Sequence, residues 1–122
     1  MTPDERHCLE RLEWHANELS KLLQVLGGAH FVAGRDDAVV ATFYGTVKRG
    51  LKDDADACHA QGPALSKAEA IWLQTTVYSA YTALQASSTG PVGPDTYRGA
   101  VKAHQIVHTA LVELRRRLAH TR

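Results

Sequence analysis

The longest uncharged segment of this chain limits what it can fold into more than any other feature. Residues 70–94 contain no Asp, Glu, Lys or Arg, although 22% of the 122-residue sequence is charged. The first part of the segment, AIWLQTTVYSAYTALQA, has the spacing of apolar residues that is typical of a helix. A helix without a charged outer face is usually buried on more than one side, by its own domain or by a partner.

Capping and stop signals divide the sequence into four predicted helices. Thr2 followed by Pro3 predicts the start of the first helix, and Gly27-Gly28 predicts its end. Ser66 and Glu69 form a capping box that begins the third helix. The helices are predicted over residues 3–26, from 36 or 37 to about 59, over 66–86, and from 95 or 96 nearly to the C-terminus.

Each predicted helix carries an apolar stripe with alternating three- and four-residue spacing, and on the last helix the stripe includes His104. Four amphipathic helices of similar length joined by short connections favour an all-α, four-helix antiparallel up-down bundle. A chain of 122 residues suits one domain of this kind, so residues 1–122 are predicted to form a single domain.

Two tryptophans point away from the predicted stripes. Trp14 lies opposite the leucines of the first helix, and Trp72 lies beside small and polar residues on the third. Outward tryptophans are enriched at interfaces. The sequence therefore predicts a homodimer or a protein partner that binds the outward face of the third predicted helix. The alternative is that Trp72 packs within its own domain. The predicted interface residues are Trp14, Trp72, Thr75, Thr76, Ser79 and Ala83.

Two cysteines share one end of the predicted bundle, since Cys8 begins the first helix and Cys58 ends the second. Two inward thiols at one level allow a disulfide, or a metal site completed by a carboxylate or imidazole. The simpler interpretation is that both are buried apolar side chains, and that an Asp54–Arg115 ion pair closes the same end.

His104 and His108 lie one turn apart on the last predicted helix. Two imidazoles at this spacing can reach one metal ion, so a metal- or small-ligand-binding bundle is an alternative function. The competing interpretation is a buried His104 that is hydrogen-bonded within the bundle, to Tyr44, Thr76, Gln74 or Tyr81.

An arginine followed closely by a histidine occurs twice, as Arg98 with His104 and as Arg115 with His120. This arrangement resembles the motif of the HEPN-domain ribonucleases, which are small helical bundles. The resemblance implies that Arg98 would contact the scissile phosphate and that His104 would act as acid or base. The residue after Arg98 is Gly99, where those enzymes usually carry a polar residue.

The composition excludes several functional classes. A formal net charge of +1 disfavours nucleic-acid and membrane-surface binding, and no segment is apolar enough for a membrane span. The N-terminus has no signal-peptide pattern, so a cytoplasmic protein is expected, and the Ala- and Arg-rich composition suggests a bacterial source. No phosphate loop or other cofactor motif is present, so no cofactor is expected. A non-enzymatic accessory or regulatory protein that binds by association is therefore the predicted function.

Overall fold

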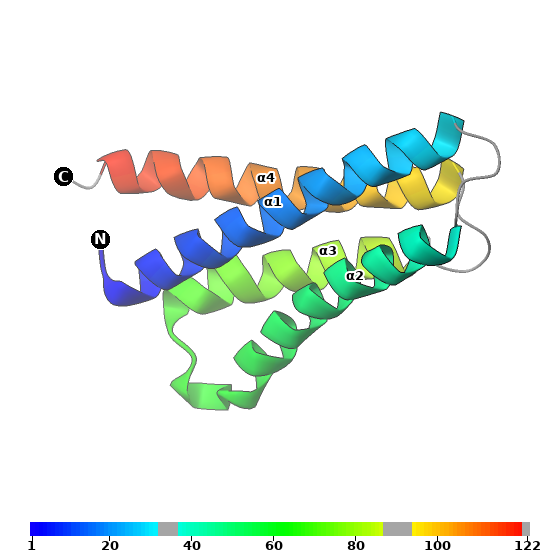
Figure 1. Ribbon diagram of the computed structural model, residues 1–122. Helices are drawn as coiled ribbons and strands as arrows, with labels where there is room; N and C mark the ends of the chain where they lie inside the picture. Colours follow the sequence, from blue (N-terminus) through cyan, green and yellow to red (C-terminus); the bar gives the residue numbers. More distant parts are fainter. Residues whose placement is uncertain (32–36, 87–93, 121–122) are drawn as a thin grey trace.

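The computed structural model describes residues 1–31, 37–86 and 94–120, and this part of the chain is helical and contains no strand. The long helices are α1 (Pro3–Phe31), α2 (Asp37–Ala60), α3 (Thr75–Ala86) and α4 (Pro94–His120), with a 3-10 helix, η1 (Gly62–Ala64), and a π-helix, η2 (Glu69–Gln74), between α2 and α3. Successive long helices run in opposite directions, and both termini lie at one end (Figure 1). The prediction of an all-α four-helix bundle is confirmed.

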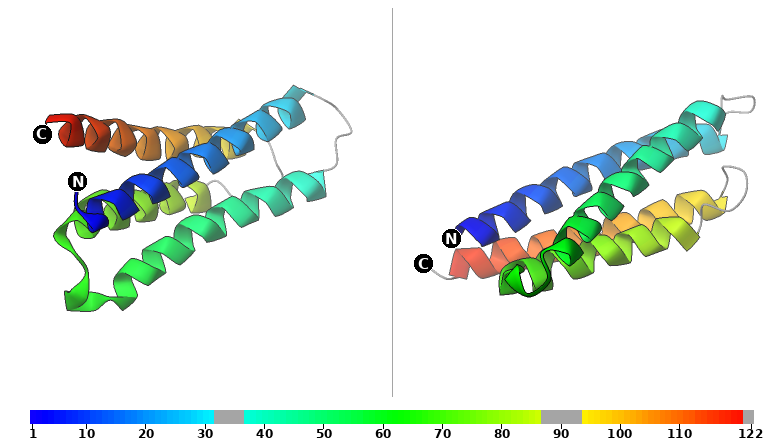
Figure 2. Two further views of the ribbon diagram at one scale, coloured as in Figure 1. Left: turned by 60° about the vertical axis from the view of Figure 1, so that its left-hand side comes forward. Right: turned by 90° about the horizontal axis from the view of Figure 1, so that it is seen from below.

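The four helices form a ring in which each packs against the next along the chain. α1 packs against α2 and α4, and α3 packs against the same two helices. α2 diverges from the other three toward its C-terminal end, where η1 turns the chain back into η2 (Figures 1 and 2).

The core follows a repeat of four and three residues along each helix. This spacing keeps one seam facing the neighbouring helices and is typical of up-down bundles. The buried positions of α1 are Cys8, Leu12, His15, Leu19, Leu22 and Leu26. Those of α2 are Val40, Tyr44, Val47, Leu51, Ala55 and Cys58. Those of α4 are Thr96, Ala100, Ala103, Val107, Leu111 and Leu114.

The start of α1 is capped as predicted. The Thr2 backbone N–H donates to Oε1 of Glu5 at 2.9 Å, and the Glu5 N–H donates to Oγ1 of Thr2 at 3.1 Å. The predicted end at Gly27-Gly28 is wrong, because α1 continues to Phe31. Glycine inside a helix costs only about 1 kcal/mol, which a packed 29-residue helix tolerates.

One bond of the predicted capping box forms, since the Glu69 N–H donates to Oγ of Ser66 at 3.1 Å. Oε1 of Glu69 accepts from the Ser66 hydroxyl at 3.0 Å, and not from the Ser66 backbone N–H as in a full capping box. The helix that follows begins as the π-helix η2, which the sequence did not predict. Gly62, with φ of +51°, begins η1 in the connection before η2, at a backbone conformation that glycine adopts without strain. Of the two predicted starts of the second helix, residue 36 lies outside the described residues, and α2 is described from Asp37. The turn predicted over 87–94 lies outside the described residues except for Pro94, which begins α4.

Candidate functional site

The outward face of η2 and α3 carries exposed residues and no charge. Ile71, Thr75, Tyr78 and Thr82 follow each other at spacings of four, three and four, and all four are exposed. Ile71 is 52% exposed and Tyr78 is 63% exposed, which is high for large apolar side chains. The Thr75 hydroxyl donates to the Ala70 carbonyl and the Thr82 hydroxyl to the Tyr78 carbonyl, so neither needs a partner's hydrogen bond.

The predicted interface residues divide between this face and the core. Thr75 is exposed and Ser79 is half-buried, whereas Thr76 and Ala83 are buried. Trp72 is half-buried and packs against the core. Thr76 and Ala83 therefore do not face outward as predicted, because the small side chains allow α2 and α4 of the same chain to approach. Ile71 and Tyr78 are not among the predicted interface residues, although the sequence shows their helical spacing to Thr75 and Thr82.

Three surface grooves border η2 and α3. A groove of about 400 Å³ lies against α2, lined by Ala55, Asp56, His59, Gln74, Thr75, Tyr78 and Ser79. Trp72 and Arg117 line two others, of about 470 and 220 Å³, near the starts of α1 and η2 and the end of α4. The exposed face of η2 and α3 is therefore bordered by grooves that a partner's side chains can enter.

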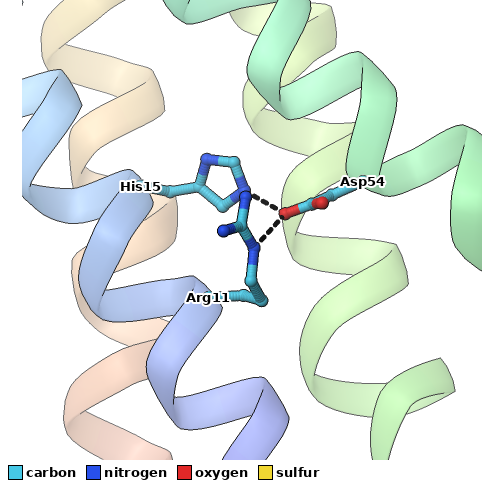
Figure 3. Close-up of polar contacts among 3 residues, drawn as sticks. All are labelled: Arg11, His15 and Asp54. Carbon is cyan, nitrogen blue, oxygen red and sulfur yellow. Dashed lines mark hydrogen bonds and ion pairs between the residues drawn. The ribbon is translucent and has the colours of Figure 1, made fainter.

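A polar cluster of Arg11, His15 and Asp54 joins α1 to α2 (Figure 3). Nε2 of His15 lies 2.6 Å from Oδ2 of Asp54, and Nε of Arg11 donates to the same oxygen at 2.8 Å. Burial raises the pKa of Asp54, but the two hydrogen bonds and the charges of His15 and Arg11 outweigh it, so the pKa stays below its ordinary value. An ionised carboxylate only accepts hydrogen bonds, so Nε2 of His15 carries the hydrogen.

Trp14 covers this cluster from the solvent side. Its ring lies 4.7 Å from the Arg11 guanidinium carbon and makes an edge-on contact with the His15 ring, with centroids 5.0 Å apart. The ring also lies against Gly50 of α2, where an added Cβ would be 3.3 Å from the indole. Trp14 remains 43% exposed, so it is outward as predicted but seated on its own chain.

The cluster replaces the predicted Asp54–Arg115 pair, which is wrong. Arg115 instead lies 3.5 Å from Glu13 across α1 and α4. His15 is only 1% exposed, so a substrate cannot reach its ring, and the cluster serves to join two helices. A repeat of four and three residues starting at Cys8 would have placed His15 in the core.

Cys8 and Cys58 are both buried and free, as the simpler interpretation of the sequence held. Burial, together with the charge of Glu69, raises the pKa of Cys8 to about 12 and also raises that of Cys58. Thiols that hold their protons this strongly are poor nucleophiles and poor metal ligands. Within the described residues, no group of three or more His, Cys, Asp and Glu side chains is placed to hold a metal ion.

The histidines of α4 lie near its surface. His104 is half-buried and His108 is exposed, so His104 is at the edge of the core and not at its centre as expected. No hydrogen bond joins His104 to any of its four expected partners, Tyr44, Gln74, Thr76 and Tyr81, all of which are described. The Tyr44 hydroxyl donates instead to the Leu84 carbonyl at 2.7 Å. Burial lowers the pKa of His104, and the charge of His108 lowers it further. Arg98 is exposed and lies 3.4 Å from Asp95.

Comparison of the chain with protein-family models, with curated proteins and with solved structures found no significant match. In the described ranges, no helix has both the length and the apolar character needed to cross a bilayer.

Proposed function

We propose that this protein is a small, non-enzymatic interaction protein that forms a homodimer through the outward face of η2 and α3. The observation that carries the proposal is the exposure of Ile71 and Tyr78 on a helix face without a charged side chain. Apolar side chains gathered on one helix face are typical of the centre of a protein interface. The charged side chains that line the flanking grooves, such as Asp56 beside Tyr78 and Lys67 and Arg117 beside Ile71, would lie at its rim.

The character of the face favours a second copy of the chain as the partner. A face without charge has no like charges to bring together when it meets itself across a two-fold axis. Because α-helices rise about 1.5 Å per residue, residues 71–86 offer a seam roughly 20 Å long. The groove beside Tyr78, which is lined by His59 and Ser79, extends the contact onto α2.

The proposal also accounts for the placement of the small core residues. Thr76 and Ala83 bring α3 close to its neighbours within the chain, and Tyr78 is left on the opposite side. An accessory or regulatory role in a bacterial cytoplasm remains part of the proposal. The two buried free thiols suit a reducing compartment.

Sedimentation velocity of untagged protein tests the proposal. We expect the wild-type chain to sediment as a dimer, and Tyr78→Glu or Ile71→Glu to sediment as a folded monomer, because a buried carboxylate without a partner is strongly disfavoured. Val112→Glu is the matched control, since Val112 is 44% exposed on α4 and should leave the dimer intact. A monomeric wild-type chain, or loss of the dimer in all three variants, would contradict the proposed interface.

A further inference from the structure

The two histidines in the middle of α4 have parallel rings. The ring centroids of His104 and His108 are 5.7 Å apart and the ring planes differ by 9°. Within the described residues, neither imidazole takes part in a hydrogen bond or an ion pair. Four ring nitrogens therefore lie together on one flank of the helix, and His108 is exposed to solvent.

We propose that His104 and His108 form a binding site for a divalent transition metal ion of the zinc, nickel or copper type, with water completing the coordination. Residues four apart on a helix have Cβ atoms about 5 to 6 Å apart. Zinc–imidazole bonds are about 2.0 to 2.1 Å long, so two imidazoles at this spacing reach one ion once each ring turns a nitrogen toward it. The solvent-facing position of His108 leaves room for that rotation.

The donor set selects the class of metal. Imidazole nitrogen suits zinc, copper and nickel, whereas magnesium and calcium require oxygen ligands. In the part of the chain that the structure describes, no third His, Cys, Asp or Glu completes a metal-binding group here. The site is therefore open and exchangeable, unlike a closed structural zinc site with four protein ligands.

The buried thiols are a poorer site in the same molecule. Cys8 lies near the start of α1 and Cys58 near the end of α2, whereas the histidines lie midway along α4. A thiol must lose its proton to bind metal, and burial opposes that loss at both cysteines. The histidine site is independent of the proposed dimer face on η2 and α3, so each can fail without the other.

Isothermal titration calorimetry of untagged, reduced protein with zinc, nickel, copper and magnesium salts tests this inference. We expect one zinc, nickel or copper ion per chain, with copper the tightest, and no binding of magnesium. His104→Ala and His108→Ala should each raise the dissociation constant about tenfold or more, because one of the two protein ligands is lost. His108 is exposed, so His108→Ala should fold even if His104→Ala does not, and circular dichroism checks both.

The double variant Gln105→His/His108→Gln is the matched control. It keeps the number of histidines, but adjacent residues on a helix do not face each other, so the chelating pair is lost. We expect this variant to bind as weakly as His108→Ala. The inference is overturned if the double variant binds zinc as tightly as the wild type, or if His108→Ala does so. Failure of the wild type to bind zinc, nickel and copper would overturn it equally.

Discussion

His15 of α1 and Asp54 of α2 are 39 positions apart in the sequence, and their side chains meet with Nε2 and Oδ2 separated by 2.6 Å. Arg11 donates to the same carboxylate oxygen from one turn earlier on α1. The three side chains therefore join α1 to α2 (Figure 3).

Asn in place of Asp54 should therefore destabilise the fold in a pH-dependent way. At pH 7 we expect Asp54→Asn to lower the free energy of unfolding by about 1 to 3 kcal/mol, because a charged hydrogen-bond acceptor is lost. The folded-state pKa of Asp54 lies below its ordinary value. Its contribution is then complete above the ordinary value, about 4, and is lost as pH falls through the lower folded value.

Urea denaturation of the wild type and of Asp54→Asn at pH 7 and pH 3 measures this difference. The difference in unfolding free energy between the wild type and Asp54→Asn should be smaller at pH 3 than at pH 7. Asp56→Asn is the control, because Asp56 is exposed on the same helix and its 2.7 Å pair with Lys52 is a surface pair that contributes little. A gap for Asp54→Asn that is equal at both pH values would show that the charge is not responsible.

Two glycines of α2 should respond differently to alanine. Alanine favours a helix by about 1 kcal/mol over glycine, and nothing lies within 4 Å of a Cβ added at Gly45. We expect Gly45→Ala to raise the thermal unfolding temperature. Gly50→Ala should raise it less, because its Cβ would lie 3.3 Å from Cζ3 of Trp14 and the ring must move.

Removal of the Trp14 indole should let Gly50→Ala stabilise the protein as much as Gly45→Ala does. In a thermal unfolding series, Gly50→Ala should stabilise a Trp14→Ala background by as much as Gly45→Ala stabilises the wild type. Equal gains for Gly45→Ala and Gly50→Ala in the wild type would mean that the indole does not press on Gly50.

Trp72→Glu should lower the free energy of unfolding, whereas Tyr78→Glu should not. The sequence predicts Trp72 as an interface residue, but Trp72 packs against the core. We expect Trp72→Glu to lose about 2 kcal/mol or more of unfolding free energy, through lost packing and a partly buried charge. Denaturation monitored by circular dichroism at low protein concentration, where Tyr78→Glu and the wild type are both monomeric, makes the comparison.

The two cysteines should resist alkylation in the folded protein. Only the thiolate reacts with iodoacetamide, and burial raises the pKa of Cys8 to about 12. We expect mass spectrometry to find neither Cys8 nor Cys58 modified at pH 8 under native conditions. Both should react fully in guanidinium chloride. Rapid labelling of the native protein would show that this end of the bundle opens readily.

The helices and the fold class were predictable from local signals. The caps at Thr2 and Ser66 formed as expected, because their hydrogen bonds involve only residues three positions apart. The π-helix η2 (Glu69–Gln74) was not predictable from such signals. The predicted helix end at Gly27-Gly28 was wrong, because glycine permits a helix to end but does not require it.

The candidate sites depended on the tertiary structure. The sequence by itself determined that one helix lacks charge, that His104 and His108 share a helix face, and that both cysteines lie in apolar stripes. Only the packing of four helices decided that Thr76 and Ala83 face inward, that Tyr78 faces outward and that Asp54 meets His15. Small and polar residues carry little hydrophobic signal, so their side of a helix is set by how closely the neighbouring helices approach.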